Sequence, residues 1–535
     1  MFSRSALGAV IMAGLTATGV ASSQIESESL GDLSAWGQRY LALDEQEYPS
    51  SLWRGSDDDT LLALMQSVRT SELSPAERRL LRRTILSPAT RPVGSKAEAL
   101  LAERARLMLE LGEARAAAAL VPQLEEETFG LDAETLAVDL DMASGQELTA
   151  CSKLAGPVRD GAYWLKLRAV CAVLENNVAG AQIAIEFAEA QGVMDDWTVA
   201  AIFAASGDSP NAPNARYDTG VNIALSTKAD LDTSEITVAA DRPDLAAAVA
   251  QRQGVPIELR ARFAETASEI GLIAAVDRRD ILLARLDDSE YSPSSDLEQA
   301  LKDLNDPLVG DEVSALSLAE VLQSAARGDL AQYRSTAELF APDLERLPKN
   351  ALTGDFALEF ARAALMSGDR ELSQSWLDAL SIDDVVPADP YEVAVLHAVD
   401  AIARRETSSR VLRSVEKRLI STANSTPREN HAVNILTVWT GIGIPLSPIG
   451  RDFVSQTVDR GNRLAEGQQT ALKAAARADA IGETSLMVLA MTQGEARTLA
   501  GPDIAILLET LIAIGAEDIA LELGLEATTF WRKVE

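Results

Sequence analysis

The sequence is poor in the residues on which much enzyme chemistry depends. Its 535 residues include only two histidines, His397 and His431, and two cysteines. No group of these residues has the spacing of a zinc site, so we expect no metal ion. The sequence also lacks a Gly-x-Ser-x-Gly nucleophile elbow, a phosphate-binding loop and a dinucleotide-binding glycine motif. We therefore name no catalytic residue and no cofactor-binding residue, and we predict that the protein is not an enzyme.

Aromatic residues and positive charges are also scarce. Aromatic residues make up 4% of the chain, and alanine and leucine dominate its apolar residues, which favours packed helices over sheets. The 81 acidic residues outnumber the 48 basic ones and give a net charge of −33. This balance argues against nucleic acid as a partner, because such binding depends on neutralising phosphates. The simplest interpretation of the acidity is solubility.

The first 23 residues have the layout of a secretory signal peptide. Arg4 supplies a positive start, residues 6–20 are apolar, and small residues at 21–23 offer a cleavage site before Gln24. We therefore expect export to the periplasm; the alternative is an uncleaved N-terminal anchor. No later apolar run is long enough for a spanning helix, so we expect no membrane span after cleavage.

A recurrent turn signal divides the rest of the chain into helical stretches. Glycine can take the left-handed conformation that ends a helix, and an acidic residue after it favours the next helix N-terminus. The pattern occurs at Gly112-Glu113, Gly328-Asp329, Gly368-Asp369, Gly482-Glu483 and Gly515-Ala516-Glu517. Around Gly368, apolar stripes on both sides predict a helical hairpin over residues 355–380.

These hairpins predict an all-α fold, an irregular α-solenoid similar to a tetratricopeptide superhelix. The intervals between turns vary, so the repeats are degenerate. Residues 206–219 are rich in Ser, Pro, Asn and Gly and predict a loop or linker. We therefore expect two helical-repeat regions, 24–205 and 220–535, on either side of it.

Three segments give the chain a resemblance to a known group of proteins. They are Leu52-Trp53-Arg54-Gly55, Trp164-Leu165-Lys166-Leu167-Arg168 with Cys171, and Phe356-Ala357 through Gly368-Asp369 to Trp376. Together they resemble secreted, Ala- and Leu-rich helical-repeat proteins of alphaproteobacteria, over most of the chain after the signal. These motifs mark packing, so the resemblance implies a periplasmic helical array and brings no catalytic residue with it.

One motif suggests a nucleophile but lacks its context. Ser414 and Lys417 match the Ser-x-x-Lys pattern of penicillin-binding enzymes, but the Lys-Thr-Gly element is missing. Both residues lie in an ordinary charged helical pattern. We interpret the two histidines as satisfied polar residues of the fold.

A stripe of arginines is the most informative charge feature. Arg78, Arg79, Arg82 and Arg83 form two i,i+4 pairs on one predicted helix. They could pair with acidic helices of the same fold, or they could contact a partner or another anionic surface. We retain them as possible partner-binding residues.

The two cysteines, Cys151 and Cys171, predict a disulfide. The signal peptide directs them to an oxidising compartment, and Gly156-Pro157 and Gly161 between them allow two helices to fold back as neighbours. The alternative is two reduced core cysteines.

The chain lacks recognisable catalytic motifs and is predicted to form stacked hairpins. Together these two features suggest a binding function. Such stacks form long curved surfaces that suit a protein or peptide ligand. We expect a periplasmic scaffold for a protein or peptide of the cell envelope. The alternatives are a peptidoglycan-related envelope enzyme or its regulatory arm, and a motility-associated accessory protein.

Overall fold

The computed structural model describes residues 35–121, 124, 132–156, 159, 161–207, 212–238, 242–457 and 461–534. The predicted signal peptide at residues 1–23 lies outside the described residues. Across the described ranges, the protein is helical apart from two short strands, which confirms the predicted all-α class. No helix within these ranges combines the length and the apolar character that crossing a bilayer requires.

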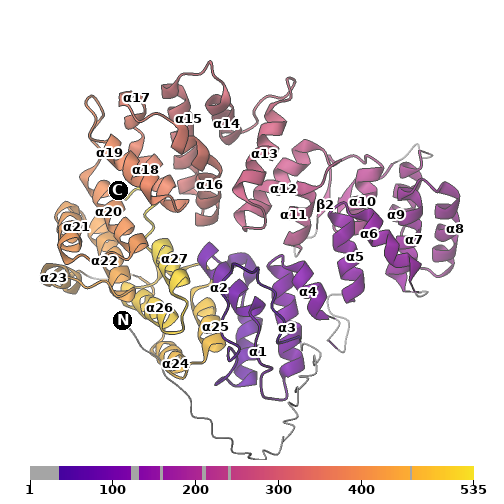
Figure 1. Cartoon of the computed structure of the whole chain (residues 1–535), viewed down its shortest axis with the longest axis horizontal. Coiled ribbons are helices and arrows are strands. Elements are labelled where there is room, and N and C mark those ends of the chain that lie inside the picture. Colours follow the sequence, from indigo (N-terminus) through magenta and orange to yellow (C-terminus); the bar gives the residue numbers. More distant parts are fainter. Residues whose placement is uncertain are drawn as a thin grey trace, which may run out of the picture.

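The helices follow one another around the molecule in Figure 1. The first quarter of the chain forms α1 (Asp58–Ser67), α2 (Pro75–Leu86), α3 (Ala97–Glu110) and α4 (Ala114–Leu120). The next part forms α5 (Ala133–Ala143), α6 (Glu147–Ser152), α7 (Ala162–Leu174), α8 (Val178–Ala190), α9 (Asp196–Ala205), α10 (Gly220–Lys228) and α11 (Pro243–Gln251). Strands β1 (Arg216–Tyr217) and β2 (Thr237–Val238) form a single parallel pair beside α10.

The second half of the chain is also helical. It continues with α12 (Ile257–Glu269), α13 (Ala275–Leu286), α14 (Asp296–Asn305), α15 (Asp311–Arg327), α16 (Leu330–Arg346), α17 (Ala351–Gly354), α18 (Ala357–Met366) and α19 (Arg370–Ala379). It ends with α20 (Pro390–Arg404), α21 (Ser409–Thr422), α22 (Thr426–Gly441), α23 (Pro448–Gln456), α24 (Glu466–Arg477), α25 (Ile481–Thr492), α26 (Gly501–Ala513) and α27 (Glu517–Ala527).

Many neighbouring helices pack as hairpins. The pairs α7 with α8, α11 with α12, α14 with α15, and α18 with α19 make close contacts. The last pair is the hairpin predicted over residues 355–380. Its two helices meet through Phe360 and Trp376, whose ring centroids lie 4.9 Å apart in an edge-to-face arrangement, a favourable geometry for two buried aromatic rings. Stacking of such hairpins into an irregular solenoid stays a prediction.

Three of the five predicted glycine turns take the left-handed conformation. Gly112, Gly368 and Gly515 have φ angles of 85°, 87° and 79°. A turn also joins α15 to α16 at Gly328-Asp329 as predicted, but Gly328 is extended there, with φ −75° and ψ −152°. The prediction was wrong for Gly482, which lies inside α25. A Cβ atom on Gly482 would lie 2.5 Å from the ring of Trp53, so glycine there permits close packing instead of a turn.

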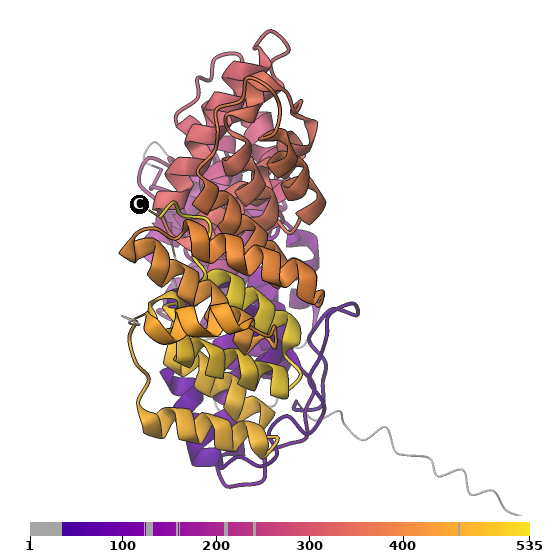
Figure 2. The same ribbon diagram turned by 90° about the vertical axis from the view of Figure 1, so that its left-hand side faces the viewer.

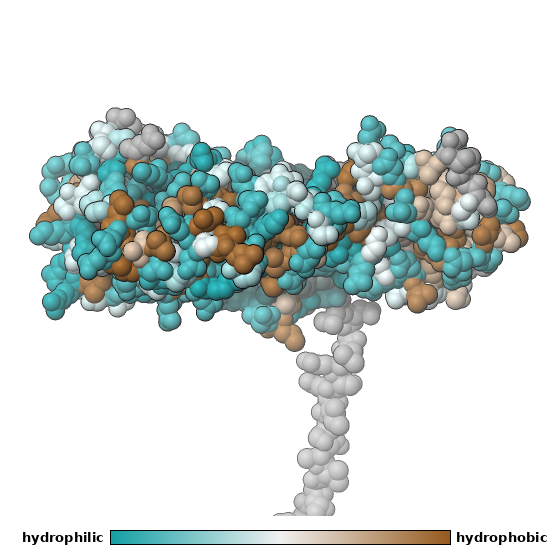
Figure 3. Space-filling model, turned by 90° about the horizontal axis from the view of Figure 1, so that it is seen from above, coloured by the Kyte–Doolittle hydropathy of each residue, from teal (hydrophilic) through white to brown (hydrophobic). Residues whose placement is uncertain are grey.

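The two ends of the chain pack against each other. Helices α1 and α2 contact α25, and α2 also contacts α27. Figures 1 and 2 both show the yellow C-terminal helices beside the indigo N-terminal ones. Residues from both ends therefore belong to one large hydrophobic core. The molecular surface shown in Figure 3 is mostly hydrophilic, with scattered hydrophobic groups.

A second, smaller core lies between residues 138 and 259. The described residues of the predicted loop or linker at 206–219 are non-helical, and its Ala215 and Tyr217 are buried in this smaller core. The two cores differ in which helices they join. Helices α1–α4 share their core with the C-terminal half, and α7–α10 form the smaller core with parts of α5, α11 and α12.

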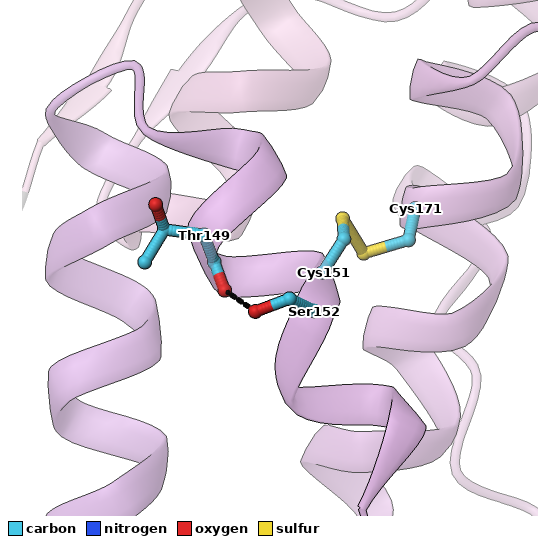
Figure 4. Close-up of a disulfide and its surroundings, with 4 residues drawn as sticks. All are labelled: Thr149, Cys151, Ser152 and Cys171. Carbon is cyan, nitrogen blue, oxygen red and sulfur yellow. Dashed lines mark hydrogen bonds between the residues drawn. A yellow bond between two sulfur atoms is a disulfide. The ribbon is translucent and has the colours of Figure 1, made fainter.

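The smaller core contains the disulfide. Cys151 at the end of α6 is bonded to Cys171 of α7, with Cα atoms 5.7 Å apart, as Figure 4 shows. The predicted pairing is confirmed. The hydroxyl of Ser152 donates to the carbonyl oxygen of Thr149 over 2.6 Å and closes the last turn of α6 beside the bond.

Candidate functional site

Three adjoining cavities lie where α2, the end of α12, the start of α16, and α27 converge. Their volumes are about 310, 330 and 280 Å³. Residues of α2 and α16 and the end of α12 line both the first and the second cavity. The first and third cavities share Leu330 and Glu526, and the second and third share Arg79 and Arg334. We call the three together the central cleft.

Helix α2 forms one wall of the cleft because its apolar face is buried in the core while several of its arginines face the cavities. The hydroxyl of Ser74 accepts from the backbone N–H of Glu77, whose carboxylate accepts from the N–H of Ser74, so a capping box starts the helix. Leu80 and Leu81 are buried in the large core. The arginines occupy the remaining positions, and Arg78, Arg79 and Arg82 line the second cavity.

Three of the four stripe arginines form ion pairs within the protein. Arg79 pairs with Asp518 and Glu522 of α27, and Arg83 pairs with Asp518 over 3.0 Å. Arg82 pairs with two other acidic residues, Glu45 and Glu113. Arg83 also stacks over the ring of Tyr48, 4.5 Å from its centroid. These three side chains therefore connect α2 to distant parts of the chain.

Arg78 differs from the other three. It is half-buried and lines both the first and the second cavity. Its side chain makes no ion pair or hydrogen bond with any described residue. Burial lowers the pKa of its guanidinium, but an arginine remains charged at neutral pH. A positive charge without a partner therefore faces the cleft.

Glu269, the last residue of α12, lines the same two cavities. Its carboxylate likewise forms no hydrogen bond and no ion pair within 4 Å among the described residues. Burial raises its pKa, and so does the nearby charge of Glu265, while Arg278 acts in the opposite direction. Arg78 and Glu269 are therefore opposite charges in one cleft that do not pair with each other.

Trp531, just after α27, lines the first cavity. Only 2% of its surface is exposed, and its indole Nε1 has no hydrogen-bond partner among the described residues. A buried donor without an acceptor is costly in a folded protein.

Glu526 of α27 also lines the first cavity but has partners. It accepts from the Ser74 hydroxyl over 2.5 Å and from the backbone N–H of Ala76 over 2.8 Å. Burial raises its pKa to about 8, and the neighbouring charge of Glu522 acts in the same direction. Glu526 therefore links α27 to the start of α2, and its role is to join the two ends of the chain.

The histidines and the Ser-x-x-Lys motif lie away from the cleft. His431 is buried between the hydroxyl of Tyr391, 2.9 Å from Nδ1, and the carbonyl oxygen of Thr528, 2.6 Å from Nε2. A neutral ring protonated on Nε2 donates to the Thr528 carbonyl oxygen, and burial lowers its pKa to about 4. The Tyr391 hydroxyl also lies 2.8 Å from the carbonyl oxygen of Arg428, so its single proton is donated either to that oxygen or to Nδ1. His397 and Ser414 line a separate cavity of about 350 Å³ that Lys417 does not line.

The carboxylates of Asp57, Asp58 and Asp59 lie close enough together to suggest a cation site. Each of them has a structural role instead. Asp57 caps α1, Asp58 accepts from the backbone N–H of Lys96, and Asp59 lies 3.5 Å from the Lys96 ammonium.

The sequence analysis identified Arg78 but not Glu269 or Trp531. Glu269 is one of 81 acidic residues and has no motif around it. Trp531 lies near the C-terminus, far in sequence from α2. Only the packing of the chain ends brings these residues into one cleft.

Comparison with known proteins gave no relative for this arrangement: the chain matches no protein-family model, no curated protein and no solved structure.

Proposed function

We propose that the protein is a periplasmic scaffold that holds a protein or peptide partner in the central cleft. The observation that carries this proposal is Arg78, a charged side chain without a partner in a cleft formed by segments distant in sequence. An unpaired charge in a partly buried position is costly, and a ligand carrying the opposite charge would offset that cost.

The cleft also has the dimensions and the lining of a binding site. Each cavity is close to the lower end of the volume range typical of ligand pockets, about 300 to 1,000 Å³. Their walls combine apolar side chains such as Ile270 and Leu330 with a few charged groups. The net charge of −33 disfavours anionic competitors, while Arg78 would orient a partner.

The periplasmic location is part of the proposal. It is supported by the signal-like residues 1–23 and by the disulfide, a bond typical of oxidising compartments. N-terminal sequencing of protein from fractionated cells tests it, and we expect a mature chain that starts near Gln24. Cytoplasmic protein that retains Met1 would contradict the proposed location.

Affinity capture from a cell-envelope extract tests the binding function. The bait is compared with its Arg78→Ala variant and with Arg451→Ala, which removes an exposed arginine of α23 that has no ion pair among the described residues. We expect mass spectrometry to find partners that the wild type and Arg451→Ala retain and Arg78→Ala loses. Equal recovery with all three baits would show that the cleft is not the binding site.

Replacing all four arginines of the stripe together would not measure binding alone. Arg79, Arg82 and Arg83 form ion pairs within the protein, so their loss would weaken the fold as well as any binding. Hydrolysis of a cell-wall or peptide substrate by repeatedly purified protein would contradict the scaffold proposal and support the enzyme alternative.

A further inference from the structure

The central cleft contains two charges of opposite sign that the fold leaves unpaired. In the second cavity, Arg82 pairs with Glu45 and Glu113, and Arg334 pairs with Glu338. Arg79, which also lines that cavity, pairs with acidic residues of α27. Among the charged residues that line this cavity, Arg78 and Glu269 alone have no ion pair with a described residue.

In the first cavity, too, most ionisable side chains are held by other described residues of the protein, while Arg78 and Glu269 are not. Glu72 pairs with Arg69 over 2.9 Å, and Glu495 lies 3.6 Å from Arg497. The remaining ionisable residues there are Arg78, Glu269, Glu526 and Asp329. The carboxyl group of Glu526 is held by α2 and its pKa is raised to about 8, so it is neutral at pH 7, and Asp329 caps α16 by accepting from the N–H of Gln332 over 2.8 Å.

The two unpaired charges, Arg78 and Glu269, limit which kinds of ligand fit the cleft. A simple anion would meet Arg78 but also the carboxylates of Glu269 and Asp329, so a phosphate or an anionic lipid headgroup is disfavoured. A simple cation would meet the carboxylates and leave Arg78 unpaired. A ligand with a separate positive and negative end satisfies both charges.

The free ends of a short peptide have this chemistry. Its terminal carboxylate suits a guanidinium, and its terminal ammonium suits a carboxylate. An extended tripeptide spans about 10 Å, and cavities of about 310 and 330 Å³ suit a few residues better than a folded domain.

From these observations, and resting on the proposed binding function, we infer that the central cleft recognises a short peptide by its two free ends. The terminal carboxylate pairs with Arg78 and the terminal ammonium pairs with Glu269. The peptide lies along the wall shared by the first two cavities. Side chains contribute less than the ends, so peptides of different sequence bind.

Isothermal titration calorimetry with the full-length mature protein tests this assignment. The probe is Ala-Ala-Ala with both ends free, and it is compared with the N-acetylated, C-amidated and doubly blocked forms. We expect blocking either end to weaken binding at least tenfold, and blocking both to abolish measurable binding. Equal affinity for all four peptides would overturn the inference, as would tighter binding of L-alanine than of the tripeptide.

Matched variants assign each end to its residue. In Arg78→Ala the free and C-amidated peptides should bind equally, while N-acetylation still weakens binding. In Glu269→Gln the reverse should hold: N-acetylation has no further effect and C-amidation still weakens binding. Arg451→Ala and Glu371→Gln, both at exposed positions, should behave as wild type in every titration. Loss of all binding in these two controls would contradict the assignment.

The outcomes separate this inference from the proposed function. If envelope partners depend on Arg78 but Ala-Ala-Ala does not bind at millimolar concentration, end recognition is wrong and the scaffold proposal stands. If the tripeptide binds with the expected end dependence but no envelope partner is captured, the cleft recognises free peptides and the proposal of a protein partner fails.

Discussion

Replacing Glu526 with glutamine should change how the stability of the protein depends on pH. The carboxyl group of Glu526 is buried where α27 meets the start of α2, and its pKa is raised from an ordinary value of 4.5 to about 8. In the unfolded chain the proton leaves near pH 4.5, but in the folded protein it stays bound to about pH 8. The folded state is therefore favoured by this group at low pH, and that advantage is lost as the pH rises through this interval.

The size of the effect follows from the shift. One pKa unit corresponds to about 1.4 kcal/mol, so between pH 4.5 and 7 the wild type should lose on the order of 3 kcal/mol through Glu526. Glutamine resembles the protonated carboxyl in shape and keeps an acceptor for the N–H of Ala76, but it does not titrate. The stability of Glu526→Gln relative to wild type should therefore increase by about 1.4 kcal/mol for each pH unit within the interval.

Urea unfolding followed by far-ultraviolet circular dichroism at pH 5, 6, 7 and 8 measures this difference. Glu371→Gln, at an exposed site in α19, is the matched control and should follow the wild type at every pH. Titrating groups that do not interact with Glu526 contribute equally to wild type and variant, so their effects cancel in the comparison, whereas the neighbouring Glu522 and Glu77 add a smaller difference. A constant difference between Glu526→Gln and wild type across the four pH values would refute the argument that Glu526 keeps its proton in the folded protein up to about pH 8.

Three further predictions concern other parts of the fold. Replacing Cys151 and Cys171 with alanine should destabilise the smaller core by on the order of 3 kcal/mol, because the bond closes a loop of 20 residues in the unfolded chain, and the melting temperature should fall accordingly. Gly494→Ala should lower the melting temperature, because the glycine has a φ of 81° and a Cβ there would lie 1.9 Å from a backbone carbonyl oxygen; Gly467→Ala, in open space on α24, should not lower it. Because the pKa of His431 is lowered from 6.5 to about 4, its contribution to stability should be lost as the pH falls through this interval, and His431→Asn should show a smaller loss in urea midpoint between pH 6.5 and 4 than wild type.

Features set by residues close together in the chain could be predicted from the sequence. The hairpin around Gly368 is present as expected, because turns depend on a few consecutive residues. The pairing of Cys151 with Cys171 was predictable for a similar reason: they are the only two cysteines, and a short turn region separates their helices. Composition alone favoured the all-α class, since alanine and leucine suit closely packed helices.

Features that depend on which helices meet could not be predicted in this way. The sequence suggested a division at residues 206–219, but α1 and α2 pack against α25 and α27, and this contact places the beginning and end of the chain in one core. Local patterns contain no information about a contact between residues several hundred positions apart, because many apolar helix faces in this chain could satisfy one another equally well.

The candidate site shows the same limit at the level of single residues. From the sequence, Arg78, Arg79, Arg82 and Arg83 are equivalent arginines on one helix. Only the position of α27 provides Asp518 and Glu522 for two of them, and only the other neighbours of α2 neutralise Arg82. The sequence alone determined that a cluster of positive charge exists in an acidic, helical protein. The tertiary structure decided that Arg78 is the one without a partner, because ion pairing depends on distances of a few ångströms that are set when distant helices pack together.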